Sequence, residues 1–313
     1  MKIDENNPQI KYVLKVNNMN AKQYIELKKT KAVKYPLVAS TEKGAEFFFR
    51  GESLNYQSTD DTVPLGTAFS CYLDRELAYR RNEREMYEEA LRLNVASFRN
   101  DVTMTERIAR MQHYQLPTRF ADISFNALLS AHFACGGGKC KESDKDNGHD
   151  GYVRIIKVAK HKMKSFTSDI IIAISHLPLV NAEDVNPSQD DGLGKLSYEI
   201  KNNRTAFWPE TDWKEIGQQL RKEMQQVWAF KPVLNTARVR AQGGAFLAFG
   251  CRDGKEPLNP TFSPSDYDNK LAPSYGIKQI GYVQIAAEAK AKIREELRHF
   301  GMSDEIVYPE ISN

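Results

Sequence analysis

The chain has 313 residues, of which 41% are hydrophobic and 27% are charged, and its 44 basic residues nearly balance its 41 acidic residues. Such a chain is long enough to bury a core, and its near-neutral charge gives no overall electrostatic footprint for nucleic acid. The first residues lack the apolar segment of a signal peptide. No stretch reaches the roughly 18 apolar residues of a membrane-spanning helix. We therefore expect a soluble, cytoplasmic protein without a membrane partner.

The four cysteines are scattered, at Cys71, Cys135, Cys140 and Cys251. Four residues separate Cys135 from Cys140, but no second cysteine pair or nearby histidine pair completes a zinc site. We therefore expect no bound metal, and the few thiols fit a reducing compartment. The basic run 157–164 is expected to be a solvated surface.

The pattern of apolar residues predicts helices and strands in irregular alternation. In chain order we expect an entry strand and a short helix within 10–25, a strand at 46–51, helices at 73–98, 105–114 and 125–135, strands at 151–158 and 170–174, a helix at 213–226, apolar runs at 228–230 and 245–249, a strand at 280–285 and a helix at 289–300. Asp74 is the expected N-cap of its helix, Pro117 is expected to end the helix before it, and Gly301 is expected just after the last helix.

This irregular order favours an α+β fold in which a mixed or antiparallel sheet is flanked by helices. The sequence contains neither a sustained β-α-β alternation nor an internal repeat. We expect a lead-in strand and helix at 1–45 and one domain at 46–313. The region of about 160–235 within that domain is less recognisable.

Arg50 follows three phenylalanines and precedes Gly51 at the end of the predicted strand. A guanidinium in this place suits bidentate binding of a phosphate or carboxylate, and the glycine lets a ligand approach the backbone. The alternative is an arginine that is solvated or paired with a nearby acid.

A second polar segment covers 111–126, where a helix end, a proline turn and a new helix start are expected to meet. Its candidate site residues are His113, Tyr114, Arg119, Asp122, Ser124 and Asn126. They supply proton-transfer and hydrogen-bonding groups. The alternative is structural: Asp122 or Ser124 caps the following helix, and Arg119 pairs with Asp122.

A third segment, 238–246, contains Arg238 and the run Gln242-Gly243-Gly244. Paired glycines allow the backbone to approach a small molecule closely, although they also occur in plain turns. The segment matches neither a dinucleotide-binding glycine motif nor a P-loop.

Together these segments resemble the FRG domain family over about residues 46–310. The resemblance lies in Phe49-Arg50-Gly51, in Gln-His-Tyr-Gln-Leu-Pro-Thr-Arg at 112–119 with Asp122, in the helix through His132-Phe133-Ala134, in Arg238 with Gln242 to Phe246, and in a closing helix followed by Gly301 and Tyr308-Pro309. The sequence departs from the family pattern at Gln115, where the family has glycine, at Phe120-Ala121 in place of Leu-Leu, and at Ile123-Ser124 in place of Trp-Thr.

The order of these blocks is also similar to the layout of ADP-ribosyltransferases. That resemblance implies that Arg50 holds the phosphates of NAD, that Ser124 braces the nicotinamide side, and that Gln242 supports the transition state. In such a site we expect His113 to serve as a general base toward an acceptor or as a phosphate ligand. The remaining candidates for ligand binding are Gly51, Tyr114, Arg119, Asp122, Asn126 and Arg238.

Two functions follow as expectations from the resemblance. The first is a NAD-dependent ADP-ribosyltransferase or NAD glycohydrolase with a protein or nucleic-acid acceptor, in a bacterial toxin or phage-defence role. The alternative is a non-catalytic module that binds a nucleotide or nucleic acid. The sequence leaves the oligomeric state open.

Overall fold

The computed structural model of the chain describes residues 13–16, 44–54, 70–137, 148–180, 185, 194–202, 220–233, 240–241, 244–252, 256–258, 260 and 262–308. Its strands are β1 (Val13–Val16), β2 (Ala45–Glu52), β3 (Phe120–Ser124), β4 (Gly151–Ala159), β5 (Met163–Ser165), β6 (Val227–Lys231), β7 (Gly244–Phe249) and β8 (Ile277–Ile285). Its helices are α2 (Leu77–Arg81), α3 (Glu83–Leu93), α4 (Val95–Phe98), α5 (Met104–His113), α6 (Ala127–Ala134), α8 (Asp169–His176), α9 (Gly194–Asn202), α12 (Pro264–Asp268), α13 (Lys290–Arg298) and α14 (Asp304–Val307). Short 3₁₀ helices occupy Tyr72–Arg75, Lys160–Lys162, Leu177–Leu179 and Ala287–Ala289.

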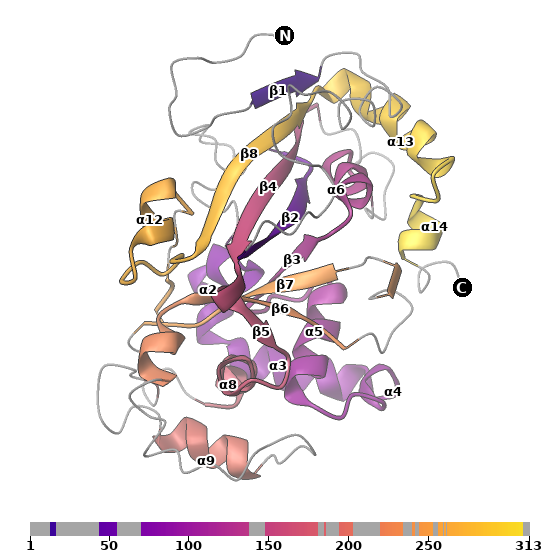
Figure 1. The fold of residues 1–313 in the computed structure, drawn as a ribbon. Coiled ribbons are helices and arrows are strands. Elements are labelled where there is room, and N and C mark those ends of the chain that lie inside the picture. The colour runs from indigo at the N-terminus through magenta and orange to yellow at the C-terminus, as the bar shows by residue number, and fades with distance from the viewer. Residues whose placement is uncertain are drawn as a thin grey trace.

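The described strands form an eight-stranded mixed sheet in the order β1-β8-β4-β2-β3-β7-β6-β5. β1 runs parallel to β8 and β5 runs parallel to β6, whereas the other neighbours are antiparallel. The late strand β8 lies between β1 and β4, so segments from both ends of the chain are adjacent (Figure 1). The predicted combination of a mixed sheet and helices is confirmed. The division at residue 46 stays a prediction.

The sheet curls around an inner hydrophobic cluster. This cluster joins Phe48 of β2 and Ile277 of β8 to Ala229 of β6 and Leu247 of β7. β8 and β6 are five positions apart in the sheet order, and a flat sheet would separate them by roughly 24 Å at the usual strand spacing. Their side chains share one cluster because the two halves of the sheet fold toward each other.

Two groups of helices cover the other face of the sheet. α6 and α13 pack on β2, β4 and β8 in a cluster that includes Phe49, Ala131 and Val153. α3, α5, α8 and α9 pack near β3, β6 and β7 in a second cluster that includes Phe120 and Phe246. Figure 1 shows the first group in the upper half of the molecule and the second group in the lower half. The seam between the two halves is therefore at β2 and β3, which are neighbours in the sheet.

The helix α5, which lies next to this seam, shows how the local sequence determines where a helix begins and ends. Thr103 and Glu106 form a reciprocal capping box at its start, which satisfies backbone donors that no helical carbonyl can reach. Ile108 and Met111 are buried on the side of the helix that faces the core. The helix ends at His113, four residues before Pro117, so the chain leaves the helix earlier than the proline requires.

Several predicted elements are correct, and others need correction. Residues 73–98 are helical but divided among a 3₁₀ helix, α2, α3 and α4. Asp74 is not an N-cap: it lies inside the 3₁₀ helix, where its carboxylate accepts two hydrogen bonds from Arg80. Gly301 adopts a φ of 73° just after α13, which confirms its predicted place. Of 213–226 the structure describes 220–226, and residues 220–224 of that part are helical.

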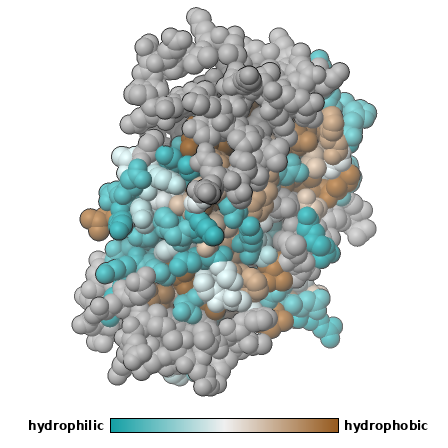
Figure 2. Space-filling view, in the orientation of Figure 1, coloured by the Kyte–Doolittle hydropathy of each residue, from teal (hydrophilic) through white to brown (hydrophobic). Residues whose placement is uncertain are grey.

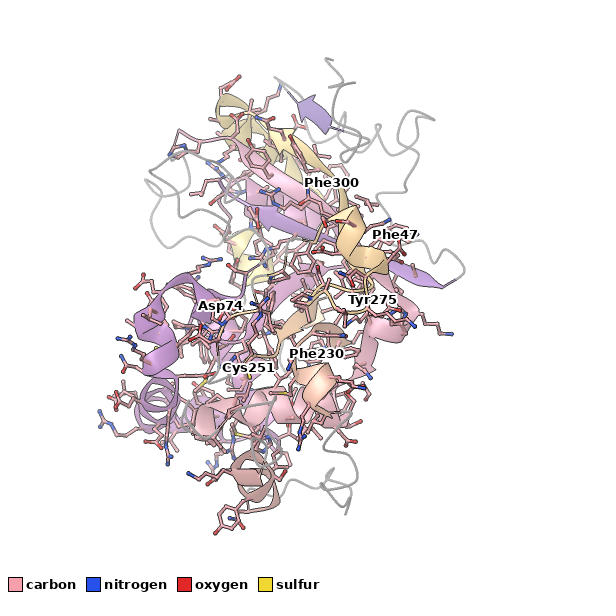
Figure 3. All side chains as sticks on the ribbon, turned by 90° about the vertical axis from the view of Figure 1, so that its left-hand side faces the viewer. Phe47, Asp74, Phe230, Cys251, Tyr275 and Phe300 are labelled. Carbon is pink, nitrogen blue, oxygen red and sulfur yellow. The ribbon has the colours of Figure 1, made fainter. Side chains whose placement is uncertain are left out.

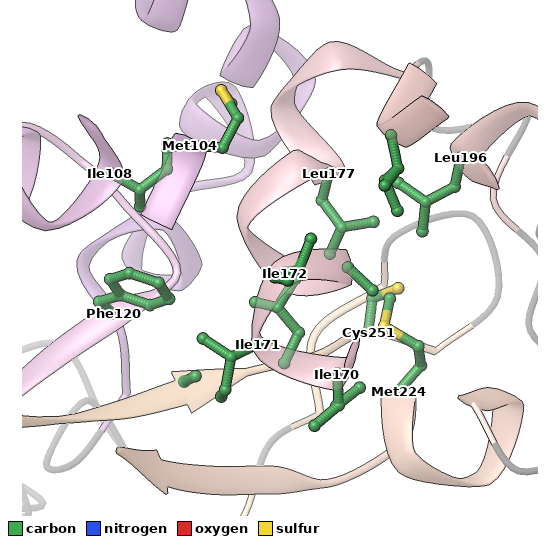
Figure 4. Packing of buried hydrophobic residues seen from close by; sticks show 14 of the residues in the cluster. Met104, Ile108, Phe120, Ile170, Ile171, Ile172, Leu177, Leu196, Met224 and Cys251 are labelled. Atoms are coloured by element: carbon green, nitrogen blue, oxygen red, sulfur yellow. The ribbon is translucent and has the colours of Figure 1, made fainter. Parts of the chain in front are cut away.

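The predicted strand at 170–174 is wrong, because these residues form the middle of α8. A short apolar run does not distinguish a buried strand from a buried helix. Here every residue from Ile170 to Ile174 is buried, since α8 is enclosed by the sheet and by neighbouring helices. Figure 4 shows the side chains of Ile170, Ile171 and Ile172 pointing in different directions into this packing.

The basic run also needs one correction. Lys160 and His161 are exposed as predicted, but Lys162 is fully buried. Its Nζ donates hydrogen bonds to Gln226 Oε1 at 2.6 Å and to the Val227 carbonyl at 3.1 Å. The ammonium group also lies 3.9 Å from the centre of a Trp228 ring. These contacts join the segment after β4 to the start of β6.

The described surface is mainly polar. Figure 2 shows hydrophilic residues over the middle of one face. In the perpendicular view of Figure 3, Phe300 lies near α13 in the upper half, whereas Asp74 lies beside the helices of the lower half. Within the described ranges, no helix combines the length and the apolar character needed to cross a membrane.

Candidate functional site

A cavity of about 330 Å³ opens at the seam between β2 and β3. These two strands share one register pair, Phe49 with Ser124, whereas β2 and β4 pair along the whole of Ala45–Glu52. Residues 49–51 of β2 and 120–124 of β3 line the cavity. The C-terminal end of α5, the middle of α6 and the start of β7 contribute the other walls.

Arg50 spans the seam. Its Nε donates to Glu52 Oε1 at 3.1 Å, and its Nη1 donates to the main-chain carbonyl of Asp122 at 2.8 Å. Glu52 is almost fully buried, and its second oxygen accepts a 2.5 Å hydrogen bond from Arg154 Nε. The shared carboxylate thus holds two arginines. Because the Arg50 side chain is only 12% exposed, it has a fixed orientation at the wall of the cavity.

Gly51 lies where α6 packs against β2, and its predicted part in ligand binding stays a prediction. A Cβ atom at this position would lie 1.9 Å from the carbonyl oxygen of Ser130 and 2.9 Å from Phe133 Cβ. The glycine therefore permits α6 to contact β2 directly. Its absent side chain serves the packing of a helix, although Gly51 also lines the cavity.

His113, the last residue of α5, reaches the cavity from the opposite side. Only 7% of it is exposed, and its ring centre lies 5.6 Å from that of Phe246 in β7. The chain then turns through Gln115, whose φ is 61°. The left-handed conformation favours glycine, which gives a physical reason for the glycine that the family pattern has at this position.

A chain of hydrogen bonds holds Asp122. Thr118 Oγ1 donates to Gln112 Oε1 at 2.6 Å, and Gln112 Nε2 donates to Asp122 Oδ2 at 2.8 Å. Asp122 is the acidic residue that lines the cavity within the described part of the chain. It does not pair with Arg119 and it does not cap α6. The sequence places Gln112 near the site but does not reveal that it orients this carboxylate.

Ser124 lies at the junction of the three candidate segments. It is 5% exposed, and its Oγ accepts a hydrogen bond from the Asn126 backbone at 2.9 Å. Its register partners are Phe49 in β2 and Gly244 in β7, and all three line the cavity. Gly244, the second glycine of the pair in the third segment, therefore lies at the site. Gln242 and Arg238 lie outside the described residues.

Three other candidates from the sequence do not line the cavity. Arg119 is buried in a bidentate ion pair with Glu83, with both hydrogen bonds at 2.7 Å. Tyr114 is 37% exposed and packs edge-on against Phe98. Asn126 is the N-cap of α6, where its side chain accepts hydrogen bonds from two backbone amides. The geometry gives these three residues structural roles.

Aromatic residues that sequence reasoning missed complete the cavity. Tyr72 and Arg75 line one wall, with the guanidinium carbon 5.0 Å from the ring centre. Phe133 of α6 and Tyr308 line another, with ring centres 6.1 Å apart. The segment before Tyr308 is anchored where His132 Nε2 and Asp304 Oδ1 lie 2.9 Å apart. In the sequence, the Tyr308-Pro309 pair was the feature that could have indicated a site residue in this wall.

No metal centre accompanies these residues: within the described ranges, no group of three histidine, cysteine or acidic residues could hold an ion. Cys71, Cys135 and Cys251 are buried, whereas Cys140 lies outside the described residues. The site therefore consists of arginine, carboxylate, imidazole, hydroxyl and aromatic groups.

The fold and the site define a mixed α/β protein with a polar cavity at the seam of a curled sheet. Residues 45–144 match the family model of the FRG domain, and the chain thus carries an FRG domain over that range. The matched range contains Arg50, His113, Asp122 and Ser124, and it confirms the family resemblance over residues 45–144; the resemblance of the later segments stays a prediction. Comparison with curated proteins and with solved structures gave no match.

Proposed function

We propose that the cavity binds NAD through its phosphates, and that the protein cleaves the nicotinamide–ribose bond and transfers ADP-ribose to a macromolecule. The observation that carries this proposal is the position of Arg50. Glu52 and the Asp122 carbonyl hold its guanidinium at the cavity wall. Its Nη2 has no acceptor among the described residues, so this nitrogen is available to a ligand.

The charge around Arg50 favours an anionic ligand. One carboxylate, Glu52, is shared between Arg50 and Arg154. The charged residues that line the described cavity are two arginines, Arg50 and Arg75, and one acid, Asp122. A phosphate carries negative charge and accepts the bidentate hydrogen bonds that arginine offers.

The size and walls of the cavity suit one half of a dinucleotide. Its volume of about 330 Å³ lies at the lower end of the range for small-molecule sites, about 300–1,000 Å³. Tyr72, Phe133 and Tyr308 provide aromatic surface for a flat ring. We place the nicotinamide ribose and its phosphate inside, with the adenosine half extending toward the opening.

The proposed reaction breaks the bond between C1′ of the ribose and the pyridinium nitrogen. The bonding electrons go to the nitrogen, neutral nicotinamide leaves, and positive charge develops on the ribose. Asp122 stabilises this charge, because a fixed carboxylate is already oriented toward the site by Gln112. Ser124 braces the nicotinamide side. The acceptor then bonds to C1′ and gives its proton to His113.

Binding without turnover is the second candidate. It is favoured by the fact that the polar groups of β3 already have partners within the fold: Asp122 accepts from Gln112, and Ser124 Oγ accepts from the Asn126 backbone. In this case Arg50 and His113 recognise a nucleotide that is not consumed.

A turnover assay separates these functions. The protein is incubated with NAD, alone and with cell lysate, and released nicotinamide is quantified. NAD labelled in its adenylate part shows whether protein or nucleic acid receives ADP-ribose. We expect release by the wild type, and a loss of about 10- to 100-fold in Arg50→Gln, because a hydrogen bond to a charged group contributes about 1.5–3 kcal/mol. The matched control is Arg99→Ala, which removes an exposed arginine.

Saturable binding without nicotinamide release would leave the second candidate and exclude the transferase. Equal release by Arg50→Gln and Arg99→Ala would remove Arg50 from the reaction. A toxin or defence role follows from the same proposal. Expression of the wild type in bacteria is then expected to slow growth, whereas Arg50→Gln is expected to have no effect; equal toxicity of both would contradict this role.

A further inference from the structure

The side chain of Ser130 is a buried polar group whose partner is missing from the fold. Ser130 lies in α6, is 1% exposed and is one of the residues that line the cavity. No described residue forms a hydrogen bond with its Oγ. Buried hydroxyls in proteins are nearly always hydrogen-bonded, so this exception needs an explanation.

A second buried helix serine shows the usual arrangement. Ser175 in α8 is also 1% exposed, but its Oγ donates to the Ile171 carbonyl at 2.7 Å and lies 3.0 Å from Thr105 Oγ1. The corresponding carbonyl for Ser130 belongs to Asn126, and it accepts the Ser130 backbone amide but not the hydroxyl. Helix geometry alone therefore does not leave a serine hydroxyl without a partner.

The packing of α6 places Ser130 beside the arginine that we assign to the phosphate. Because Gly51 lacks a Cβ, the Ser130 backbone contacts β2 at the residue after Arg50. Ser130 and Arg50 then line the same cavity, together with Leu129 and Phe133 of α6. A ligand anchored at Arg50 is thus close to the helix residue that carries this hydroxyl, a group able to donate and to accept.

We infer that Ser130 is a ligand-binding residue of this cavity and that its hydroxyl forms a hydrogen bond with an oxygen of the sugar–phosphate part of the nucleotide. The inference rests on the proposed nucleotide site and adds a residue that neither the sequence motifs nor the family pattern indicated. It also explains why an apolar helix retains a hydroxyl on this wall: the hydrogen bond forms when the ligand enters.

The test uses Ser130→Ala with three probes: inorganic pyrophosphate, ADP and ADP-ribose. Binding is measured by titration calorimetry, and the unfolding midpoint is measured without ligand. We expect affinity to fall by about 3- to 10-fold, the loss of one hydrogen bond. The midpoint without ligand is expected to stay the same or rise, because no hydrogen bond within the protein is lost. Weaker pyrophosphate binding assigns the bond to a phosphate oxygen, and a loss confined to ADP-ribose assigns it to a ribose hydroxyl.

Ser175→Ala is the matched control, with the opposite expectation: a lower midpoint and unchanged affinity. Ser130→Cys is a second variant that keeps the side-chain shape but replaces the hydroxyl by a poor hydrogen-bonding group. If the wild type binds the probes and both Ser130 variants bind them equally well, this inference is wrong while the nucleotide site stands. A wild type that binds none of the probes overturns the proposed site and this inference together.

Discussion

The ion pair between Arg119 and Glu83 gives a quantitative prediction about which arginine supports the fold. Both side chains are at least 95% buried, and the pair is bidentate with 2.7 Å hydrogen bonds. The pair connects the first residue of α3 to the residue before β3. Substitution Glu83→Leu leaves the buried guanidinium without this carboxylate. Removing one partner of a buried pair destabilises a protein by about 3–5 kcal/mol.

For a domain of this size, that loss corresponds to roughly 6–20 °C in Tm. Thermal and urea unfolding of Glu83→Leu measure it directly. The double variant Glu83→Leu with Arg119→Met is expected to recover most of the stability, because an apolar pair of similar size replaces two buried charges. The exposed pair Arg92–Glu89 is the control, and Glu89→Leu is expected to change stability by less than about 1 kcal/mol.

Two results would refute this reasoning. The first is a Glu83→Leu variant as stable as Glu89→Leu, which would mean that the buried pair does not stabilise the fold. The second is an Arg119→Met variant that keeps its stability and loses nucleotide binding, which would make Arg119 the ligand-binding residue that the motif suggested.

Three further predictions follow from single residues. Gly51→Ala is expected to lower stability by about 1–3 kcal/mol and to weaken nucleotide binding, because its Cβ would lie 1.9 Å from the Ser130 carbonyl oxygen; an unchanged unfolding midpoint would contradict this packing. Gln115→Gly is expected to raise stability by about 0.5–1 kcal/mol, since φ is 61° at this residue; a lower midpoint would contradict it. Burial lowers the pKa of Lys162 from 10.5 to about 7. The unfolded chain therefore binds more protons than the folded chain between these values, and stability rises with pH across that window. Urea unfolding of Lys162→Met is expected to show a weaker rise, and an equal rise would contradict the assignment.

The sequence predicted the strand that carries Arg50 because its signal is local. Three phenylalanines followed by arginine and glycine, in a run bounded by two glycines, are typical of a buried strand that ends at an edge. The same applies to α5, which was predicted at 105–114 and is observed at Met104–His113. In contrast, β3 was missed, because residues 120–124 follow a proline turn and lie directly before an apolar helix.

The roles of the side chains in the site were harder to predict from the sequence, because these roles depend on partners that are far away along the chain. Both Arg50 and Arg119 belong to motifs of the family, but Glu83 binds Arg119 in the core, whereas Arg50 lies at the seam. Ser130 gives no signal in an apolar helix, and Tyr308 becomes a wall residue only when the C-terminal segment packs on Phe133. Such contacts are fixed by tertiary packing and not by local pattern.

Titration of ADP-ribose into the wild type, Arg50→Gln and Arg99→Ala tests the central claim most directly, because this ligand contains the phosphates and ribose without requiring turnover. We predict saturable binding by the wild type and Arg99→Ala, and affinity about 10- to 100-fold lower in Arg50→Gln, measured at a temperature where unfolding curves show all three proteins to be folded. Equal affinity in all three proteins would show that Arg50 is not a phosphate anchor, and no binding by the wild type would contradict the nucleotide site itself.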